Sequence, residues 1–370
     1  MPGRGAGRLP RYGGAIPTAA LLSFRLGGTD GVSVEAAKWQ HALEALGYAT
    51  YSVAGSGPVD VTVPGLALDA ATRPTGTEVA AAVGRADLVV VENLCSLPLN
   101  PAAWEVVAAT LAGRPALLHH HDLPWQRARF ADHPPPPDDP RWTHVTINDR
   151  SRAELAGHGI RATTVYNSFA VPGHGGPDDD DGAVARGVPG AVTREALGVG
   201  PGQRLVLQPT RALARKNVAG GMAAAARLGA TYWLLGPAED GYGPELERLV
   251  TVAPCPVVLG TPDLGGTGAV TIDDAYRACD VVALPSTWEG FGNPSLEAVV
   301  YRRPLVIGPY PVARELAAFG FDWFGLDDLG RLDAWLDHPD PGLLERNLVV
   351  ARDHFDLEDL PGRIAAVLPH

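Results

Sequence analysis

Cysteine is scarce in this chain. Among its 370 residues only Cys95, Cys255 and Cys279 are cysteines, and they form no C-x-x-C pair. An odd number of widely separated cysteines argues against a disulfide framework and is typical of reduced thiols in a reducing compartment. We therefore expect a cytoplasmic protein with buried, unpaired cysteines.

Positive charge is also in short supply, with 30 Lys and Arg residues against 42 Asp and Glu residues and a formal net charge of -12. Binding to nucleic acid or to anionic lipid needs a basic surface, so we expect neither partner. No apolar run approaches the about 20 residues of a membrane-spanning helix, so we expect no stable membrane insertion. Residues 1–15 lack the apolar core of a signal peptide and are interpreted as a tail. Nothing in the sequence indicates the oligomeric state.

Several catalytic signatures are missing. The sequence contains no G-x-x-x-x-G-K-[ST], no H-E-x-x-H and no G-x-S-x-G. The turn "LGGTDG" at residues 26–31 lies between a predicted strand and a predicted helix, but it does not spell G-x-G-x-x-G. This makes a nicotinamide-dependent enzyme a weak alternative. The turn offers backbone N–H groups that suit an anion or sugar hydroxyls.

What the chain does contain is a regular alternation of apolar strands and helix-like segments. Strands are predicted at 18–24, 48–55, 86–93, 115–122, 142–148 and 162–169, and again at 203–210, 229–236, 255–260, 279–286 and 303–308. Such alternation predicts an α/β fold with parallel sheets covered by helices. We therefore expect two Rossmann-like, doubly wound domains at 1–168 and 196–350, a linker with a mobile loop at 169–195, and a terminal helical segment at 351–370.

An aspartate run, Asp178 to Asp181, lies in the Gly/Pro-rich linker. It lacks the ligand spacing of a calcium loop, so a solvated acidic loop is the favoured interpretation.

The stretch "STWEGFGNPSLEAVVY" at 286–301 directly follows the apolar run from Val281 to Leu284, which reads as a buried parallel strand. Asn293 is a good N-cap for the helix that follows it. Glu289 then lies in a strand-to-helix loop and Glu297 just inside the helix. Ligands of open α/β sheets bind beyond the carboxyl ends of the strands, so both acids are candidates for a binding site. A loop acid followed by a solvated helix acid is the alternative.

A second strand-to-helix loop, "TRALARK", carries Arg211, Arg215 and Lys216 after the strand at 203–210. Cations at this edge of a sheet suit a phosphate group. A solvated basic turn explains the residues equally well at this point.

Three histidines and Asp122 end the strand at 115–122, in "LLHHHD". Successive strand residues point to opposite faces, so three consecutive histidines do not readily converge on one metal ion. We expect no metal site, and one histidine that hydrogen-bonds a substrate.

Together these motifs resemble the retaining GT-B glycosyltransferases of family 4, and the resemblance covers nearly the whole chain. The segment "EGFGNPSLE" from Glu289 to Glu297 is similar to the E-x7-E element of that family, and "TRALARK" is similar to its phosphate-binding element. The turn "GGTDG" resembles the family's glycine loop, and "VYNSFAV" resembles its N-G-V element. His121 best matches the family's histidine in the first domain.

The resemblance implies a fold and a reaction. The fold is GT-B, with two Rossmann-like domains facing across a cleft and a C-terminal helix that crosses back to the first domain. The reaction is the transfer of a hexose from a nucleotide-diphosphate sugar to an acceptor hydroxyl, with retention of configuration. Neither a divalent metal nor another cofactor is implied.

The resemblance also assigns roles to residues. Catalytic roles fall to Glu289, which faces the donor sugar, and to His121 with Asp122 from the first domain. Donor-binding roles fall to Arg211 and Lys216 on the phosphates, Glu297 on the ribose, Phe291, Gly292 and Asn293 around the sugar, and Gly28 in the glycine loop.

The sequence departs from the family pattern in "EAVVYRRPLVI" and "PYPVARE", which leaves contacts in those segments open. We expect the acceptor to be a small soluble metabolite, a glycan or a natural-product scaffold. A GT-B-fold sugar phosphorylase, a nucleotide-sugar hydrolase and a catalytically silent nucleotide-sugar-binding protein remain as alternatives.

Overall fold

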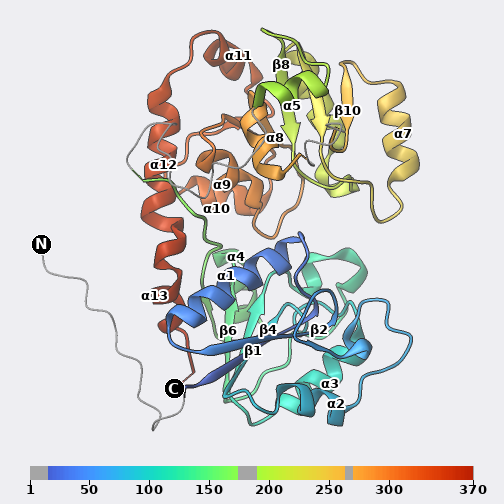
Figure 1. The fold of residues 1–370 in the computed structure, drawn as a ribbon, viewed down its shortest axis with the longest axis vertical. Helices are drawn as coiled ribbons and strands as arrows, with labels where there is room; N and C mark the ends of the chain where they lie inside the picture. Colours follow the sequence, from blue (N-terminus) through green and yellow to red (C-terminus); the bar gives the residue numbers. More distant parts are fainter. Residues whose placement is uncertain (1–15, 174–189, 263–269, 370) are drawn as a thin grey trace, which may run out of the picture. The chain divides into compact units, whose positions relative to one another are not determined.

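The computed structural model describes residues 16–173, 190–262 and 270–369. Contacts within the chain divide the described residues into two units (Figure 1). The first unit holds the residues up to Ser168 together with those from Leu357 onward, and the second unit runs from Phe169 to Asp356. The predicted tail at 1–15 and the aspartate run at 178–181 lie outside the described residues.

The first unit is built on a seven-stranded parallel sheet in the order β3-β2-β1-β4-β5-β6-β7. Its strands are β1 (Thr18–Arg25), β2 (Ala49–Ser56), β3 (Val61–Thr62), β4 (Leu88–Glu92), β5 (Ala116–His120), β6 (Trp142–Thr146) and β7 (Ala162–Thr164). Its helices are α1 (Gly31–Ala45), α2 (Gly76–Val83), α3 (Pro101–Leu111), α4 (Asp149–Gly157) and α13 (Leu360–Ala365). Helices α2 and α3 pack in one apolar cluster with the sheet, and α1 and α13 pack in another. The sheet is therefore covered on both faces, as its continuous apolar strands predict.

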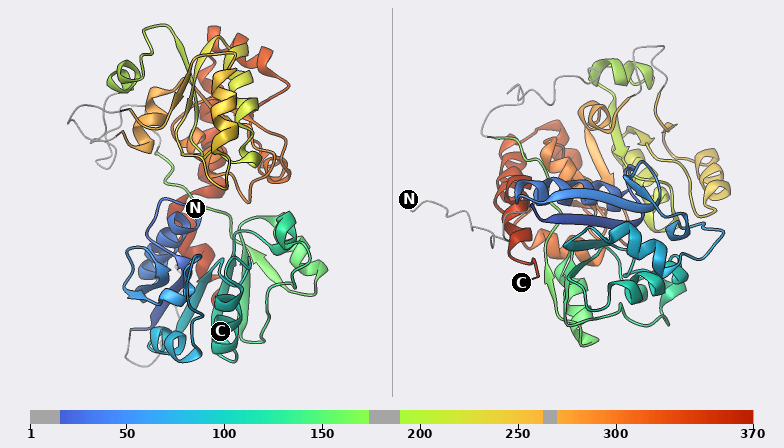
Figure 2. Two further views of the ribbon diagram at one scale, coloured as in Figure 1. Left: turned by 90° about the vertical axis from the view of Figure 1, so that its right-hand side faces the viewer. Right: turned by 60° about the horizontal axis from the view of Figure 1, so that its bottom comes forward.

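The second unit contains a six-stranded parallel sheet in the order β10-β9-β8-β11-β12-β13. Its strands are β8 (Arg204–Gln208), β9 (Ala230–Leu234), β10 (Val257–Leu259), β11 (Val281–Leu284), β12 (Leu305–Ile307) and β13 (Phe324–Gly325). Its helices are α5 (Gly190–Ala196), α6 (Val218–Arg227), α7 (Gly243–Thr251), α8 (Ile272–Ala278), α9 (Asn293–Val300), α10 (Pro311–Ala317), α11 (Leu329–Asp337) and α12 (Pro341–Phe355). Figure 2 shows these helices lying on both sides of the strands. The predicted α/β class with two doubly wound sheets is confirmed.

The strand order reverses once in each sheet, between β1 and β4 in the first and between β8 and β11 in the second. At such a point the loops after the two central strands leave the sheet in opposite directions. The crevice between them is the usual ligand site of a doubly wound sheet.

The C-terminal segment returns to the first unit, as the resemblance implies. Leu360 and Ile364 of α13 lie in the same buried cluster as Trp39 and Leu43 of α1. The predicted start of this segment at residue 351 is wrong, because α12 continues to Phe355 within the second unit.

The predicted linker at 169–195 also needs correction at its end. Residues 190–196 form α5, and Arg194 of this helix donates to the carbonyl of Ala278 and to the carboxylate of Asp280. The end of the predicted linker is thus an ordered part of the second unit, whereas residues 174–189 lie outside the described residues.

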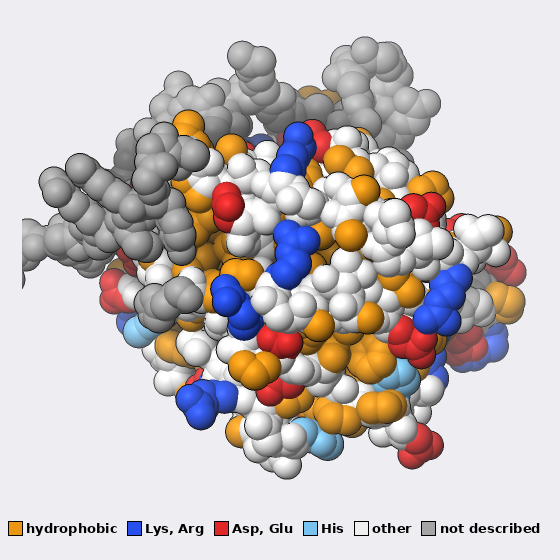
Figure 3. Space-filling model, turned by 90° about the horizontal axis from the view of Figure 1, so that it is seen from below, with side chains coloured by type: hydrophobic (Ala, Val, Ile, Leu, Met, Phe, Trp, Pro, Cys, Tyr) orange, Lys and Arg blue, Asp and Glu red, His pale blue; other side chains and the backbone are white. Residues whose placement is uncertain are grey.

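The surface carries both signs of charge. On the face shown in Figure 3, Lys and Arg side chains stand apart from one another among acidic, polar and apolar groups. Among the described residues, no helix has the length and apolar character needed to cross a membrane.

Candidate active site

Two loops at the strand-order reversal of the second sheet lie side by side. One follows β8 and spans residues 209–217, and the other follows β11 and spans residues 285–292. The N–H of Thr287 donates to the carbonyl of Arg215 at 2.8 Å, and the side-chain amide of Asn217 donates to the carbonyl of Pro285 at 3.1 Å. These bonds fix the two loops against each other.

Lys216, Arg215 and Glu289 form a charged cluster between these loops. The ammonium nitrogen of Lys216 lies 2.5 Å from Oε1 of Glu289, and the guanidinium of Arg215 lies 3.0 Å from Oε2. The hydroxyl of Ser286 donates to Oε1 at 2.6 Å. Lys216 and Glu289 are only 8% and 6% exposed. Two cations facing one carboxylate leave the cluster with one positive charge in excess, which suits an anionic ligand.

Burial and charge compete in setting the ionisation of this cluster. Burial raises the pKa of Glu289, but the charges of Lys216 and Arg215 outweigh it and hold that pKa below its ordinary value. Burial and the charge of Arg215 lower the pKa of Lys216, which the charge of Glu289 only partly offsets. Because the ordinary pKa of lysine lies far above neutrality, we take both side chains as charged at neutral pH.

Arg211, the predicted partner of Lys216 on the phosphates, points elsewhere. Its guanidinium pairs with the carboxylate of Glu239 at 2.6 Å, and both side chains are partly exposed. The structure instead places Arg215 next to Lys216. From the sequence, Arg215 was one cation of a basic loop, and nothing favoured it over Arg211 as the partner of Lys216.

Gly292 shapes the second loop. Its φ of 95° is left-handed, and a Cβ at this position would lie 2.1 Å from the hydroxyl oxygen of Tyr310. Only glycine fits both the backbone and the space. Gly292 is also the N-cap of α9, so the predicted N-cap at Asn293 is wrong by one residue. The Phe291 side chain is buried, with its ring centroid 6.1 Å from that of Phe169.

Glu297 lies in the second turn of α9, where its carboxylate accepts a hydrogen bond from the hydroxyl of Tyr276. Tyr276 is buried and stacks on Tyr301 with ring centroids 4.9 Å apart. The sequence carried no signal for Tyr276, because nothing in the spacing brings α8 next to α9.

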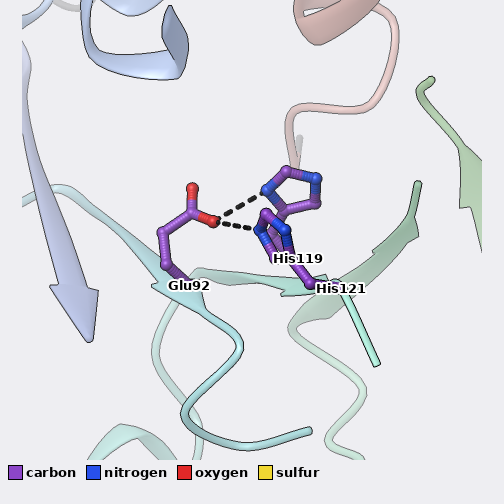
Figure 4. Close-up of side chains that lie close together, drawn as sticks. All are labelled: Glu92, His119 and His121. Atoms are coloured by element: carbon purple, nitrogen blue, oxygen red, sulfur yellow. Dashed lines mark hydrogen bonds and ion pairs between the residues drawn. The ribbon is translucent and has the colours of Figure 1, made fainter. Parts of the chain in front are cut away.

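In the first unit, Glu92, His119 and His121 form a buried cluster, shown in Figure 4. Oε2 of Glu92 lies 2.9 Å from Nδ1 of His119 and 2.9 Å from Nε2 of His121. Glu92 ends β4 and is paired in register with His119 of β5. Sequence reasoning missed Glu92, although a carboxylate at the end of the apolar run "LVVVE" is a signal.

Successive histidines of β5 point to opposite faces, as predicted. His120 turns away from Glu92 and hydrogen-bonds Ser96 at 2.6 Å and His144 at 2.9 Å. Within the described residues, Glu92, His119 and His121 are the one group that could hold a metal ion, with ligand atoms within 4.8 Å of one another. The two nitrogen–oxygen separations of 2.9 Å are those of N–H···O bonds, and the expectation of no metal site stays a prediction.

The two histidines keep Glu92 ionised. Burial opposes the charge, but the charges and hydrogen bonds of His119 and His121 lower the pKa of Glu92 to about 2. Burial alone would lower the pKa of His121, whereas its hydrogen bond to Glu92 and the nearby carboxylates raise that pKa above its ordinary value.

The other two residues predicted for the site in the first unit are Asp122 and Gly28, which lie outside the Glu92 cluster. Asp122 pairs with the guanidinium of Arg127 at 2.9 Å. Gly28 lines a cavity of about 640 Å³ together with Lys38 and Leu357.

Comparisons with known proteins bear on the fold and on the second unit. Residues 216–324, which include Lys216, Glu289 and Glu297, match the family model described as glycosyl transferases group 1. The chain is 25% identical to the mannosylglucosylglycerate synthase of Thermotoga maritima, with 92% of this chain and 97% of the relative covered. It is 24% identical to the enzyme of the same name from Petrotoga mobilis, with 82% and 85% covered.

Solved structures share the fold. The structure of Anabaena HepE in complex with UDP-glucose has a TM-score of 0.69 at 19% identity, with 95% of this chain and 99% of that chain covered. WaaG, a glycosyltransferase involved in lipopolysaccharide biosynthesis, has a TM-score of 0.61 at 16% identity, with the same coverage. These matches confirm the predicted GT-B fold.

Proposed function

We propose that this chain is a GT-B glycosyltransferase that retains the sugar's configuration when it transfers a hexose. The donor is a nucleotide-diphosphate sugar and the acceptor is a hydroxyl group. The observation that carries the proposal is the Lys216–Arg215–Glu289 cluster at the strand-order reversal of the second sheet.

The cluster supplies the two charges that the reaction needs. Transfer of a glycosyl group develops positive charge on the sugar and negative charge on the leaving diphosphate. Lys216 and Arg215 are fixed cations that can stabilise the diphosphate without a metal ion. Glu289 is a fixed carboxylate beside them that can stabilise the sugar. Because the cluster is held by hydrogen bonds within the protein, little reorganisation is required during the reaction.

The remaining donor contacts follow the family resemblance. Glu297 accepts hydrogen bonds from the nucleotide ribose, and the backbone from Phe291 to Asn293 surrounds the sugar. Arg211 joins the phosphates by exchanging its exposed partner Glu239, which costs little because exposed ion pairs contribute only about 0–1 kcal/mol. From the first unit, the resemblance assigns Gly28, His121 and Asp122 to the reaction.

The relatives suggest which substrates to test first. Two are named mannosylglucosylglycerate synthases, and one structural neighbour holds UDP-glucose. We propose a soluble, hydroxyl-rich acceptor in the cytoplasm, such as a small metabolite or a short glycan. Nucleotide-activated mannose and glucose are the first donors, and glucosylglycerate is the first acceptor.

The experiment is a panel of nucleotide sugars, each incubated with and without acceptors, in which release of nucleoside diphosphate is measured. The proposal predicts release that depends on the acceptor. Equal release without acceptor indicates a hydrolase, formation of a sugar phosphate from orthophosphate indicates a phosphorylase, and binding without turnover indicates a silent protein. Glu245→Gln is a matched control for Glu289→Gln, because Glu245 is an exposed acid paired with Arg248 in the same unit.

A further inference from the structure

Glu92 is a carboxylate with 0% exposure at the end of a central strand. It lies at the strand-order reversal of the first sheet, where β4 is the neighbour of β1. Apolar residues fill the rest of β4, and one more would pack there without the desolvation cost of a buried charge. A buried acid at the ligand-binding edge of a doubly wound sheet therefore calls for a role other than packing.

The hydrogen bonds of Glu92 dictate how His121 is presented. An ionised carboxylate only accepts, so Nε2 of His121 must carry the proton that it donates to Oε2. The other ring nitrogen, Nδ1, has no hydrogen-bond partner among the described residues. The ring is 7% exposed, whereas His119 and Glu92 are fully buried. Nδ1 is therefore the atom of His121 left to meet a substrate.

His119 also holds the carboxylate of Glu92. It donates to the same oxygen through Nδ1, so it holds the opposite tautomer from His121. Its ring lies against Trp39 of α1, with centroids 4.2 Å apart. The carboxylate is thus held in place by a residue that is itself packed tightly.

Asn93 fixes the backbone that carries His121. Its side-chain oxygen accepts from the N–H groups of His121 and Asp122 at 3.1 Å and 3.2 Å. Its own φ is 59°, a left-handed conformation that asparagine tolerates better than most residues. Glu92 therefore holds the imidazole ring of His121, while Asn93 holds its main chain.

We propose that Glu92 is a positioning residue that sets the tautomer and ring orientation of His121, so that Nδ1 is presented to the substrate. This inference rests on the proposed function, in which His121 is a catalytic residue. Glu92 itself does not touch the substrate. It acts through His121, in the way that a buried acid orients a catalytic histidine in other enzymes.

The kinetic test compares Glu92→Gln, Glu92→Leu, His121→Ala and the two double variants with the wild type. We expect each Glu92 variant to lower kcat at least about tenfold, which is less than the about 100- to 10,000-fold that a positioned acid–base group contributes, because Glu92 acts only through His121. The affinity for free nucleoside diphosphate, measured by calorimetry, should stay within about twofold, since the proposed nucleotide contacts lie in the second unit. In the His121→Ala background, loss of Glu92 should have little further effect.

His120→Gln is the matched control, because it removes a buried histidine from the other face of the same strand. We expect it to lower thermal stability and leave kcat within about twofold. A Glu92→Gln variant that folds and keeps wild-type kcat overturns the proposal. A double variant whose loss of kcat equals the product of the fold-losses of Glu92→Gln and His121→Ala also overturns it.

A second readout does not need turnover. Long-range proton–nitrogen NMR of histidine-labelled protein, recorded at alkaline pH where both imidazole rings are neutral, should show His121 protonated at Nε2 and His119 at Nδ1, with the His121 pattern lost in Glu92→Leu. If no nucleotide sugar is turned over, the proposed function fails, while this spectrum still decides whether Glu92 sets the tautomer. An unchanged spectrum in Glu92→Leu, or stoichiometric metal bound to Glu92, His119 and His121, contradicts the proposal.

Discussion

The ammonium nitrogen of Lys216 lies 2.5 Å from a carboxylate oxygen of Glu289, and both side chains are buried. This ion pair joins the loop after β8 to the loop after β11, which are the two loops of the strand-order reversal. The desolvation cost of a buried ion pair often exceeds its attraction, so such a pair is weak evidence for a purely stabilising role. The pair therefore links the fold of the second unit to its proposed chemistry.

Replacing Lys216 with alanine should raise the barrier of sugar transfer by about 2–4 kcal/mol, the range for losing one preorganised electrostatic group. The reason is that the leaving diphosphate loses its nearest buried cation. Steady-state rates at saturating donor measure the effect. Arg248→Ala, which removes an exposed cation of the same unit, is the control and should retain wild-type rates. A Lys216→Ala variant as fast as this control would exclude Lys216 from the reaction.

Glu289→Gln should depress turnover and leave the affinity for nucleoside diphosphate unchanged or higher. The substitution removes the negative charge aimed at the sugar, while Lys216 and Arg215 stay available to phosphate. Calorimetry with nucleoside diphosphate and rates with the full donor separate the two effects. A turnover within about twofold of wild type, less than about 0.5 kcal/mol in the barrier, would contradict the assignment.

Glu297→Ala should weaken nucleotide binding by about 1.5–3 kcal/mol, the contribution of a hydrogen bond to a charged group. Titration with nucleoside diphosphate measures this loss. Because Glu297 also accepts from Tyr276, the control is Tyr276→Phe, which removes that bond and keeps the carboxylate. Equal affinities for Glu297→Ala and the wild type would remove Glu297 from the site.

Chelation of divalent cations should leave the transfer rate unchanged. The proposed site neutralises the diphosphate with Lys216 and Arg215, which carry the charge that a metal would otherwise supply. The rate is measured with chelator and again with added magnesium. Activity that disappears with chelator and returns with magnesium would refute this mechanism.

The fold should lose stability in acid partly through Glu289. Its pKa in the folded protein lies below the ordinary value, so its charge stabilises the fold fully above that value. This stabilisation is lost as the pH falls from the ordinary pKa of 4.5 through the lowered pKa of Glu289. Thermal denaturation between about pH 6 and pH 3 should therefore show a steeper decline for wild type than for Glu289→Gln. Parallel declines would show that Glu289 is not held ionised by its neighbours.

The sequence predicted those features that local patterns determine. The apolar run from Val281 to Leu284 was predicted as a buried strand and is β11, because four successive apolar residues need cover on both faces. The position of Glu289 in a loop after that strand followed directly. The GT-B fold followed from the alternation of strands and helices together with the family motifs.

Features that depend on register and loop conformation were not predictable. Glu92 meets His119 and His121 because β4 and β5 pair with Glu92 opposite His119, a relation between residues far apart in sequence. Arg215 rather than Arg211 lies beside Glu289, in a loop whose backbone turns left-handed at Asn217 with a φ of 50°. A spacing of charges along the chain does not reveal either relation.

Proton NMR of a reaction with a nucleotide-activated hexose and an acceptor alcohol tests the proposed transfer and its stereochemistry together. We expect nucleoside diphosphate and a glycoside to form together, the glycoside to keep the anomeric configuration of the donor, and Lys216→Ala to suppress both signals. A glycoside of inverted configuration would contradict retention, and the absence of transfer from every nucleotide sugar in the panel would contradict the proposed function.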